Sequence, residues 1–222
     1  MDLIVVIGLG RFGSAVAHSL SQLGHDVLAA DQNIELVQEW AGRLNHVVQV
    51  DSTNVAALRG LGVQDARHAV VGIGSNLEAS VLTVLALSEL GVQDIWAKAV
   101  NQNHGKILER TGAHHVVYPE SAMGERVAHL VTGKMIDFIE FDDGFAIAKT
   151  AAPREAWGRT LAEADIRKKH GITVVGVKRH NEDFVHARPE TDIREGDLLI
   201  VSGPTRMVEG FVSLRSTPPR GS

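Results

Sequence analysis

A glycine-rich turn near the N-terminus carries the clearest chemical signal in the sequence. Gly8, Gly10 and Gly13 are spaced as G-x-G-x-x-G, directly after an apolar strand pattern and directly before a helical one. Such a turn lets the phosphates of a nucleotide lie almost on the backbone, where a Cβ would clash, and the following helix points free N–H groups at them. Arg11 and Phe12 lie inside the turn. A cation there favours a ligand with more negative charge than a bare pyrophosphate, such as a triphosphate.

Two aspartates end the strands predicted next along the chain. Asp31 follows Gly13 by 18 residues, at a place where an acid accepts hydrogen bonds from ribose hydroxyls and repels a 2′-phosphate. The ligand is therefore expected to be NAD, ATP or ADP rather than NADP. Asp51 ends the next strand, where it can contact an adenine edge, and Ser52 follows it. Helix capping is the alternative role for both aspartates, with Ser52 or Thr53 as a further candidate cap.

Three more strand ends complete this candidate site. Gly74 and Asn76 separate a strand pattern from a helical one, and ligand contact and simple turn chemistry are equally open there. Lys98 stands in an otherwise apolar strand, so its ammonium is expected at the strand end, near a phosphate or a salt-bridge partner. Glu120 begins a helix after the sixth strand, where a carboxylate can bind a cation shared with phosphates. Its alternative role is helix capping or a helix-dipole contact.

Alternating strand and helix patterns over the first 135 residues place these side chains at one edge of a sheet. The predicted strands are Leu3–Ile7, Asp26–Ala30, His46–Val50, Ala69–Gly72, Asp94–Ala97 and His114–Val117. The predicted helices cover residues 11–23, 33–43, 53–61, 76–90, 103–111 and 120–135. Six short, Val-rich strands joined by helical crossovers predict an α/β fold of the Rossmann type, with a doubly wound parallel sheet.

The regular alternation of strand and helix patterns ends after Met135. The patterns that follow predict a small α+β unit. Its expected strands are Asp137–Phe141, Phe145–Thr150, Thr173–Lys178, Phe184–His186 and Leu198–Ser202, and its expected helices are Leu161–Lys169 and Thr205–Leu214. We therefore predict a nucleotide-binding domain over residues 1–136 and a second domain over residues 137–222, with Ser216–Ser222 as a frayed tail.

Cations gather in the second predicted domain. Arg167 to His170 and Lys178 to His180 lie on both sides of a predicted helix–strand turn, with Pro189 following. One interpretation is a solvated charged face. The other is a second site for an anionic small molecule, at a dimer seam.

Composition excludes several classes of protein. The net charge is −5, and neither half has the basic excess of a nucleic-acid binder. The chain has no cysteine, which excludes disulfides and cysteine-based metal sites and suits a cytoplasmic protein. No uncharged run approaches the roughly 18 residues of a membrane span. No constellation for catalysis stands out, since Tyr118 has Ala122 rather than a lysine four residues on. A nucleotide-binding sensor is therefore favoured, and an NAD-dependent oxidoreductase is the alternative.

Several of these segments together resemble the RCK (KTN) family, the cytoplasmic regulators of potassium channels and transporters. In the first half they are the turn at 7–13, the strand end at Asp31, Val-Asp-Ser-Thr at 50–53, Ile-Trp-Ala-Lys-Ala at 95–99 and Tyr-Pro-Glu at 118–120 with Met123-Gly124. In the second half, residues 161–179 and 193–197 resemble the RCK C-terminal subdomain. The resemblance covers nearly the whole chain.

The resemblance implies a cytoplasmic subunit of a potassium uptake system, held at the inner face of the membrane by a separate transporter or channel subunit. It implies homodimers that assemble into a ring, commonly an octamer. ATP or ADP, or alternatively NAD, would occupy the first domain, with Arg11 at the terminal phosphates and a divalent or monovalent cation on Glu120. Cyclic di-AMP is the ligand that the resemblance implies for the second domain, near Arg167 and Pro189.

Overall fold

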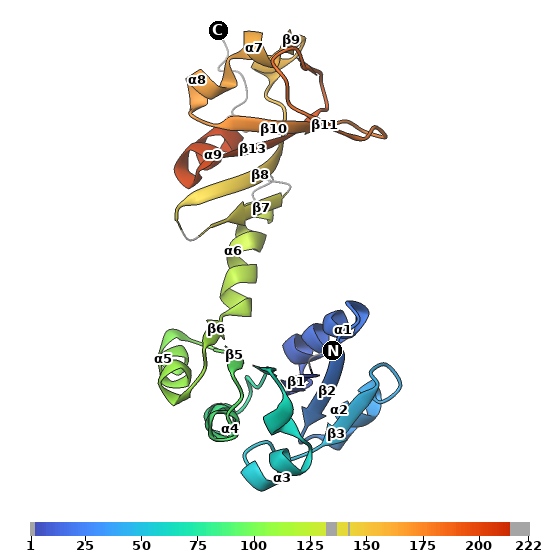
Figure 1. The fold of residues 1–222 in the computed structure, drawn as a ribbon. Coiled ribbons are helices and arrows are strands. Elements are labelled where there is room, and N and C mark those ends of the chain that lie inside the picture. The colour runs from blue at the N-terminus through green and yellow to red at the C-terminus, as the bar shows by residue number, and fades with distance from the viewer. Residues whose placement is uncertain (1–2, 132–136, 142, 214–222) are drawn as a thin grey trace. The chain divides into compact units, whose positions relative to one another are not determined.

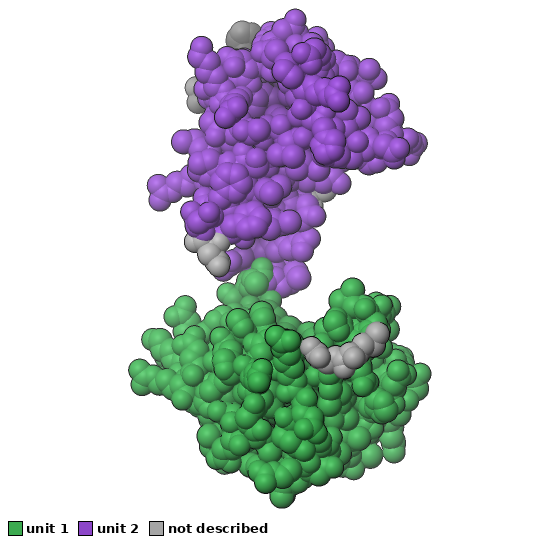
Figure 2. Space-filling model, in the orientation of Figure 1, with its two compact units in different colours: residues 1–122 green, residues 123–222 purple. Residues whose placement is uncertain are grey.

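The chain divides into two compact units. The structure is a computed structural model that describes residues 3–131, 137–141 and 143–213. Unit 1 comprises residues 1–122 and unit 2 comprises residues 123–222 (Figure 2). Each unit has its own hydrophobic core.

Unit 1 is built on one six-stranded parallel sheet in the order β3-β2-β1-β4-β5-β6 (Figure 1). The strands are β1 (Leu3–Ile7), β2 (Asp26–Asp31), β3 (His46–Gln49), β4 (His68–Val71), β5 (Asp94–Lys98) and β6 (His115–Val117). The helices are α1 (Arg11–Gln22), α2 (Ile34–Trp40), α3 (Val55–Gly60), α4 (Leu77–Glu89) and α5 (Gln102–Thr111), with a 3₁₀ turn at Val63–Asp65. Helix α6 (Pro119–Val131) begins in unit 1 and continues into unit 2. The predicted doubly wound parallel sheet is confirmed, and all six strands start within one residue of the expected place.

Alternation of side chains along the central strand explains why helices cover both faces of this sheet. Val5 and Ile7 of β1 belong to a core shared with buried residues of α3, α4 and α5. Val6, between them, belongs to a second core shared with α1 and α2. Successive strand residues point to opposite faces, so an unbroken apolar strand requires cover on both. Because all six strands run parallel, their carboxyl ends lie at one edge of the sheet.

Unit 2 is an antiparallel sheet with helices, as predicted for the second half. Its main sheet has the order β11-β10-β13-β8-β7, and β12 and β9 form a separate pair. The strands are β7 (Asp137–Glu140), β8 (Phe145–Ala151), β9 (Arg159–Thr160), β10 (Thr173–Lys178), β11 (Phe184–His186), β12 (Asp192–Ile193) and β13 (Leu198–Pro204). The helices are α7 (Leu161–Ala164), α8 (Ile166–His170) and α9 (Thr205–Ser213), with a 3₁₀ turn at Arg154–Ala156.

Three details of the second half differ from the sequence prediction or lie beyond the described residues. The single helix expected over Leu161–Lys169 is two short helices, because Asp165 between them adopts a left-handed backbone with φ of +49°. The short strands β9 and β12 were not predicted, since two-residue strands carry no readable alternation. Some predicted segments lie outside the described residues. They are residues 132–135 of the helix expected over 120–135, Leu214, and the tail Ser216–Ser222.

Candidate functional site

A cleft of about 760 Å³ lies at the carboxyl ends of the unit 1 strands. It brings together every site residue predicted in unit 1 except Gly13: Gly8, Gly10, Arg11, Phe12, Asp31, Asp51, Ser52, Gly74, Asn76, Lys98 and Glu120. It also takes in residues that the sequence did not single out, among them Gln32, Asn33, Ile73 and Val100. These belong to the same strand–helix loops, so loop membership is the signal that would have found them.

The three glycines of the first turn do different things. Gly8 has φ of +93°, and a Cβ there would lie 3.0 Å from the backbone of Ile73. A Cβ on Gly13 would lie 1.8 Å from the carbonyl oxygen of Gly8, so this glycine allows α1 to approach the strand–helix turn. A Cβ on Gly10 would meet nothing within 4 Å. The open space beside Gly10 is therefore available to a ligand, whereas Gly8 and Gly13 are required by the fold.

Asp31 holds the glycine turn rather than a helix end. Its carboxylate accepts hydrogen bonds from the backbone N–H of Leu9 at 2.6 Å and of Asn33 at 2.8 Å. The cap of α2 is Asn33, whose side chain accepts from Glu35 N. The capping alternative for Asp31 is therefore wrong. The carboxylate of Asp31 is therefore held on the cleft wall next to the glycine turn.

The loop after β3 is ordered by two side-chain contacts. Asp51 Oδ1 accepts from the N–H of Thr53 at 3.0 Å and from its hydroxyl at 2.7 Å, and these bonds lower the pKa of Asp51. Ser52 is buried and its Oγ lies 2.7 Å from Thr83 Oγ1. Asn54 caps α3, so the expectation that Asp51, Ser52 or Thr53 caps this helix is wrong.

The loop after β4 combines the two roles that the sequence left open. Asn76 caps α4, accepting from Ala79 N at 3.0 Å, and it lines the cleft as well. A Cβ on Gly74 would lie 3.1 Å from Lys98 Nζ. The absence of a side chain at Gly74 thus leaves room for the ammonium of Lys98.

Lys98 and Glu120 form an ion pair across the cleft edge. Lys98 Nζ lies 2.5 Å from Glu120 Oε1, and the exposed fractions of the two side chains are 12% and 65%. The hydrogen bond from Lys98 lowers the pKa of Glu120, and the positive charges of Lys98 and Arg11 act in the same direction. The salt-bridge alternative for Lys98 is present in the structure. Glu120 offsets the charge of Lys98, and Arg11 adds a further positive charge to the cleft lining.

The described residues contain no group of three or more His, Asp or Glu side chains placed to hold a metal ion. Among the described residues that line the cleft, Glu120 offers a largely exposed carboxylate beside Lys98. A cation there would need phosphate oxygens and water to complete its shell, because hard cations bind six or more oxygens.

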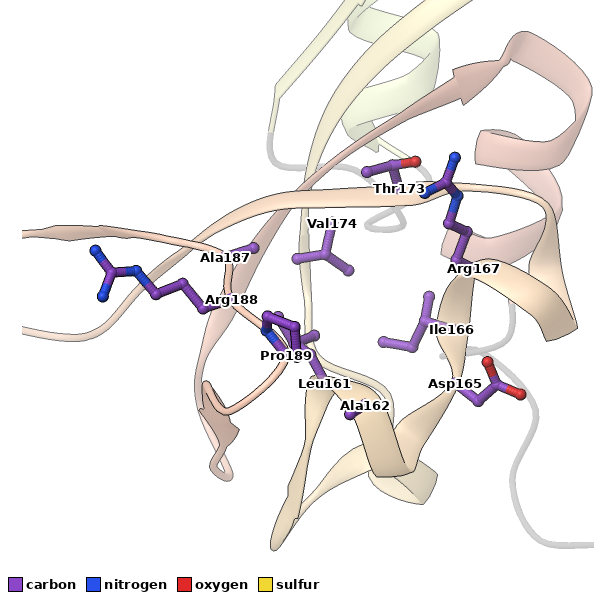
Figure 3. Close-up of a pocket in the computed structure, with 10 residues that line it drawn as sticks. All are labelled: Leu161, Ala162, Asp165, Ile166, Arg167, Thr173, Val174, Ala187, Arg188 and Pro189. Atoms are coloured by element: carbon purple, nitrogen blue, oxygen red, sulfur yellow. The ribbon is translucent and has the colours of Figure 1, made fainter.

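A second pocket, of about 450 Å³, lies in unit 2 (Figure 3). It brings together Arg167 and Pro189, the two site residues predicted there. Its other lining residues are Leu161, Ala162, Asp165, Ile166, Thr173, Val174, Ala187 and Arg188. Figure 3 shows Ile166, Val174 and Pro189 around an apolar hollow, with Arg167 at its border.

The cations at Lys178 to His180 do not join this pocket. Arg179 lies within 3.6 Å of three carboxylates, those of Glu182, Asp192 and Asp197. It therefore holds the loops of the sheet together. The sequence missed Arg188, which lines the pocket and is separated from Arg167 by 21 residues of chain.

Comparison with known proteins follows the two-part organisation. Residues 4–119 match the TrkA-N domain, and residues 149–214 match the TrkA-C domain. The chain is 40% identical over 207 residues to Ktr system potassium uptake protein C of Bacillus subtilis (strain 168), covering 93% of this chain and 94% of that protein. It is 35% identical over 207 residues to Ktr system potassium uptake protein A of the same organism, covering 93% of both.

Solved structures of the same fold carry nucleotides. The GsuK channel bound to NAD is 25% identical, with a TM-score of 0.53, over 97% of this chain and 39% of that one. GsuK bound to ADP is 27% identical, with a TM-score of 0.51, over 60% of this chain and 34% of that one. The chain thus spans well under half the length of these channel proteins. Within the described residues, no helix has the length and apolar character needed to cross a bilayer.

Proposed function

Because the chain belongs to the TrkA-N/TrkA-C (RCK) family, we propose that it is the regulatory subunit of a potassium uptake system and binds an adenine nucleotide in the unit 1 cleft. The observation that carries the proposal is the meeting of the open Gly10 turn, Arg11, Lys98 and the fixed carboxylate of Asp31 in one cleft. The relatives at 35% and 40% identity are potassium uptake proteins by name, in agreement with the expectation of a chain that is not an enzyme.

The proposed nucleotide lies with its phosphates on the first turn of α1 and its ribose on Asp31. The first turn of α1 has no side-chain cap and no acidic residue, so its N–H groups and dipole favour an anion. Arg11 and Lys98 add two positive charges. NAD is the alternative ligand, because a GsuK structure holds NAD and Asp31 accommodates the ribose of either.

A nucleotide can regulate the assembly only if it binds one of two conformations more tightly than the other. A ligand with equal affinity for both conformations does not change their populations. We infer that the γ-phosphate of ATP, with a cation on Glu120, recruits Arg11. ADP lacks this group. A coupling of about 1–3 kcal/mol between nucleotide and shape is typical of such systems.

The test is calorimetric titration of the purified chain with ATP, ADP, NAD and NADH. We expect ATP and ADP to bind one per cleft and Arg11→Ala to weaken ATP binding by about tenfold, or 1.4 kcal/mol, with a smaller loss for ADP. Arg43→Ala is the matched control, because the Arg43 guanidinium lies over the Trp40 ring and outside the cleft. Equal losses for ATP and ADP would reject Arg11 as a reader of the γ-phosphate. An affinity for NAD far higher than the affinities for ATP and ADP would identify NAD as the ligand.

For the pocket of unit 2 we propose cyclic di-AMP. Arg167 supplies a cation for a phosphate, and the apolar surface of Ile166, Val174 and Pro189 can pack against a base. Titration of cyclic di-AMP into the full chain should show saturable binding that Arg167→Ala weakens and Lys168→Ala, outside the pocket, does not. No binding at high micromolar ligand would leave Arg167 as part of a solvated face.

We propose further that the chain forms homodimers that assemble into an octameric ring. This ring would act on a membrane-embedded potassium transporter or channel subunit from the cytoplasmic side. The support is the family membership and the two Ktr uptake relatives, which the chain covers almost completely.

A further inference from the structure

The hydrogen bond between Ser52 and Thr83 links the nucleotide cleft to a buried helix face. Ser52 lines the cleft, whereas Thr83 does not. Ser52 Oγ and Thr83 Oγ1 are 2.7 Å apart, and both residues are buried, with exposed fractions of 7% and 0%. A threonine inside a helix commonly bonds the carbonyl of its own preceding turn. Here its hydroxyl is instead shared with a loop 31 residues earlier in the chain.

The position of this loop in the sheet indicates which part of a nucleotide it would meet. The glycine turn follows β1, Asp31 ends β2, and Ser52 follows β3, and these strands are neighbours in the order β3-β2-β1. Two strand spacings are about 10 Å. A nucleotide with its phosphates at the glycine turn and its ribose at Asp31 therefore presents its base to residues 51–53.

The loop is held from two sides. On its exposed side, Asp51 accepts two hydrogen bonds from Thr53. On its buried side, Ser52 is bonded to α4, a thirteen-residue helix that Asn76 caps at the cleft. A loop anchored in this way keeps its shape before a base arrives, and a preorganised site loses less entropy on binding.

We propose that Thr83 is a positioning residue for base recognition: through Ser52 it fixes the loop at residues 51–53 in the shape that selects adenine. The proposal rests on the nucleotide-binding function proposed above. Removal of either hydroxyl leaves its buried partner unsatisfied, and such a group tends to move toward water. The loop would then lose its fixed shape while the glycine turn, Arg11 and Lys98 stay in place.

The experiment measures the affinities of ATP and GTP for wild-type chain and for Thr83→Val, Ser52→Ala and the double variant. We expect wild type to prefer ATP and either single variant to reduce this preference by about fivefold to tenfold, mainly through loss of ATP affinity. The double variant should lose no more than one single variant, because both remove the same bond. Thr83→Ser retains the hydroxyl and should keep the preference.

Ser80→Ala provides the matched control. Ser80 is on the same face of α4, is fully buried, and has a hydroxyl with no hydrogen-bond partner among the described residues. It should leave the ATP-to-GTP ratio unchanged. Thermal unfolding of every variant separates a change in stability from a change in selectivity. If Thr83→Val does not fold, Ser52→Ala removes the same hydrogen bond and provides the measurement.

Four results would overturn the proposal: equal losses for ATP and GTP, additive losses in the double variant, a Ser80→Ala effect as large as that of Thr83→Val, or a wild-type chain with no base preference. A wild-type chain that binds neither nucleotide would instead contradict the proposed function itself.

Discussion

Gly10 and Gly13 belong to one sequence motif but are required for different reasons. The backbone of Gly10 has φ of −64°, which any residue adopts, and its missing Cβ faces open space in the cleft. Gly13 has no Cβ, and α1 can lie against Gly8 only for that reason. The spacing of the motif predicted both positions, but only the structure distinguishes the glycine that faces open space from the glycine that the packing of α1 requires.

Gly10→Val should therefore abolish nucleotide binding while the chain stays folded. The isopropyl group would fill the open space proposed above for phosphate, and the loss of a favourable helix cap lowers stability by no more than about 1 kcal/mol. Gly13→Ala should lower the unfolding free energy by more than about 2 kcal/mol, since its Cβ meets backbone. Calorimetry and chemical denaturation check both. Loss of folding in Gly10→Val, or tight nucleotide binding by it, would contradict the assignment.

The ion pair of Lys98 and Glu120 predicts a pH dependence of stability. The hydrogen bond from Lys98 lowers the pKa of Glu120 below its ordinary value of 4.5. A lowered pKa in the folded state contributes stability that is present above 4.5 and is lost as the pH falls through the folded-state pKa. Because Glu120 is largely exposed, the contribution should not exceed about 1 kcal/mol.

Denaturation of wild type and Glu120→Gln over a pH series measures this contribution as a difference. The difference should be constant near neutral pH and shrink in acid. In a Lys98→Met background it should be small throughout. A difference that grows as the pH falls below 4.5 would contradict the assigned pair.

At the scale of elements, the sequence predicted unit 1 well because its signals are local and repeated. Each strand is a short apolar run and each is followed by a helical pattern, so type and order are readable without tertiary knowledge. Unit 2 was less readable where its elements are shortest. The break at Asp165 left no trace in the pattern, because aspartate is compatible with a helix and with the left-handed backbone that it adopts.

The cleft residues show the same limit. The sequence placed Asp31, Lys98 and Glu120 at strand ends, since parallel strands bring their carboxyl ends to one edge. The helix caps that it considered, Asp31 for α2 and residues 51–53 for α3, were wrong. Several polar residues stand in a row before each helix, and only the backbone geometry selects Asn33 or Asn54. The partnership of Ser52 with Thr83 was unreadable, because nothing local marks a contact across 31 residues.

Substitutions at Asp165 test the division into α7 and α8. With a left-handed backbone, Asp165→Gly should be more stable than Asp165→Ala by about 1 kcal/mol, because a Cβ is penalised there. In one continuous helix the order would reverse by a similar amount, because alanine is the better helix former. Chemical denaturation of the two variants decides between these outcomes.

At the scale of the whole molecule, two units with separate cores are compatible with the two ligand sites proposed above, one in each unit. The contacts within the chain divide it at residues 122 and 123. The division of the domains at residues 136 and 137 stays a prediction, as residues 132–136 lie outside the described part of the chain.

Assembly is the prediction that belongs to this scale. A ring implies that light scattering of the purified protein finds a mass several times the 23.9 kDa of one chain, with eight chains as the expected number. The mass should be independent of dilution over a working range of concentration. A mass of one chain at every concentration would contradict the ring.

The central claim is that the cleft of unit 1 holds an adenine nucleotide, and a competition experiment tests it most directly. The purified chain is incubated with equal concentrations of ATP, ADP, NAD and GTP, freed of unbound ligand, denatured, and the released nucleotides are quantified by mass spectrometry. We predict that the wild-type chain retains an adenine nucleotide at up to one per cleft and that folded Gly10→Val retains none. Retention of no nucleotide by wild type, or equal retention by Gly10→Val, would contradict the account.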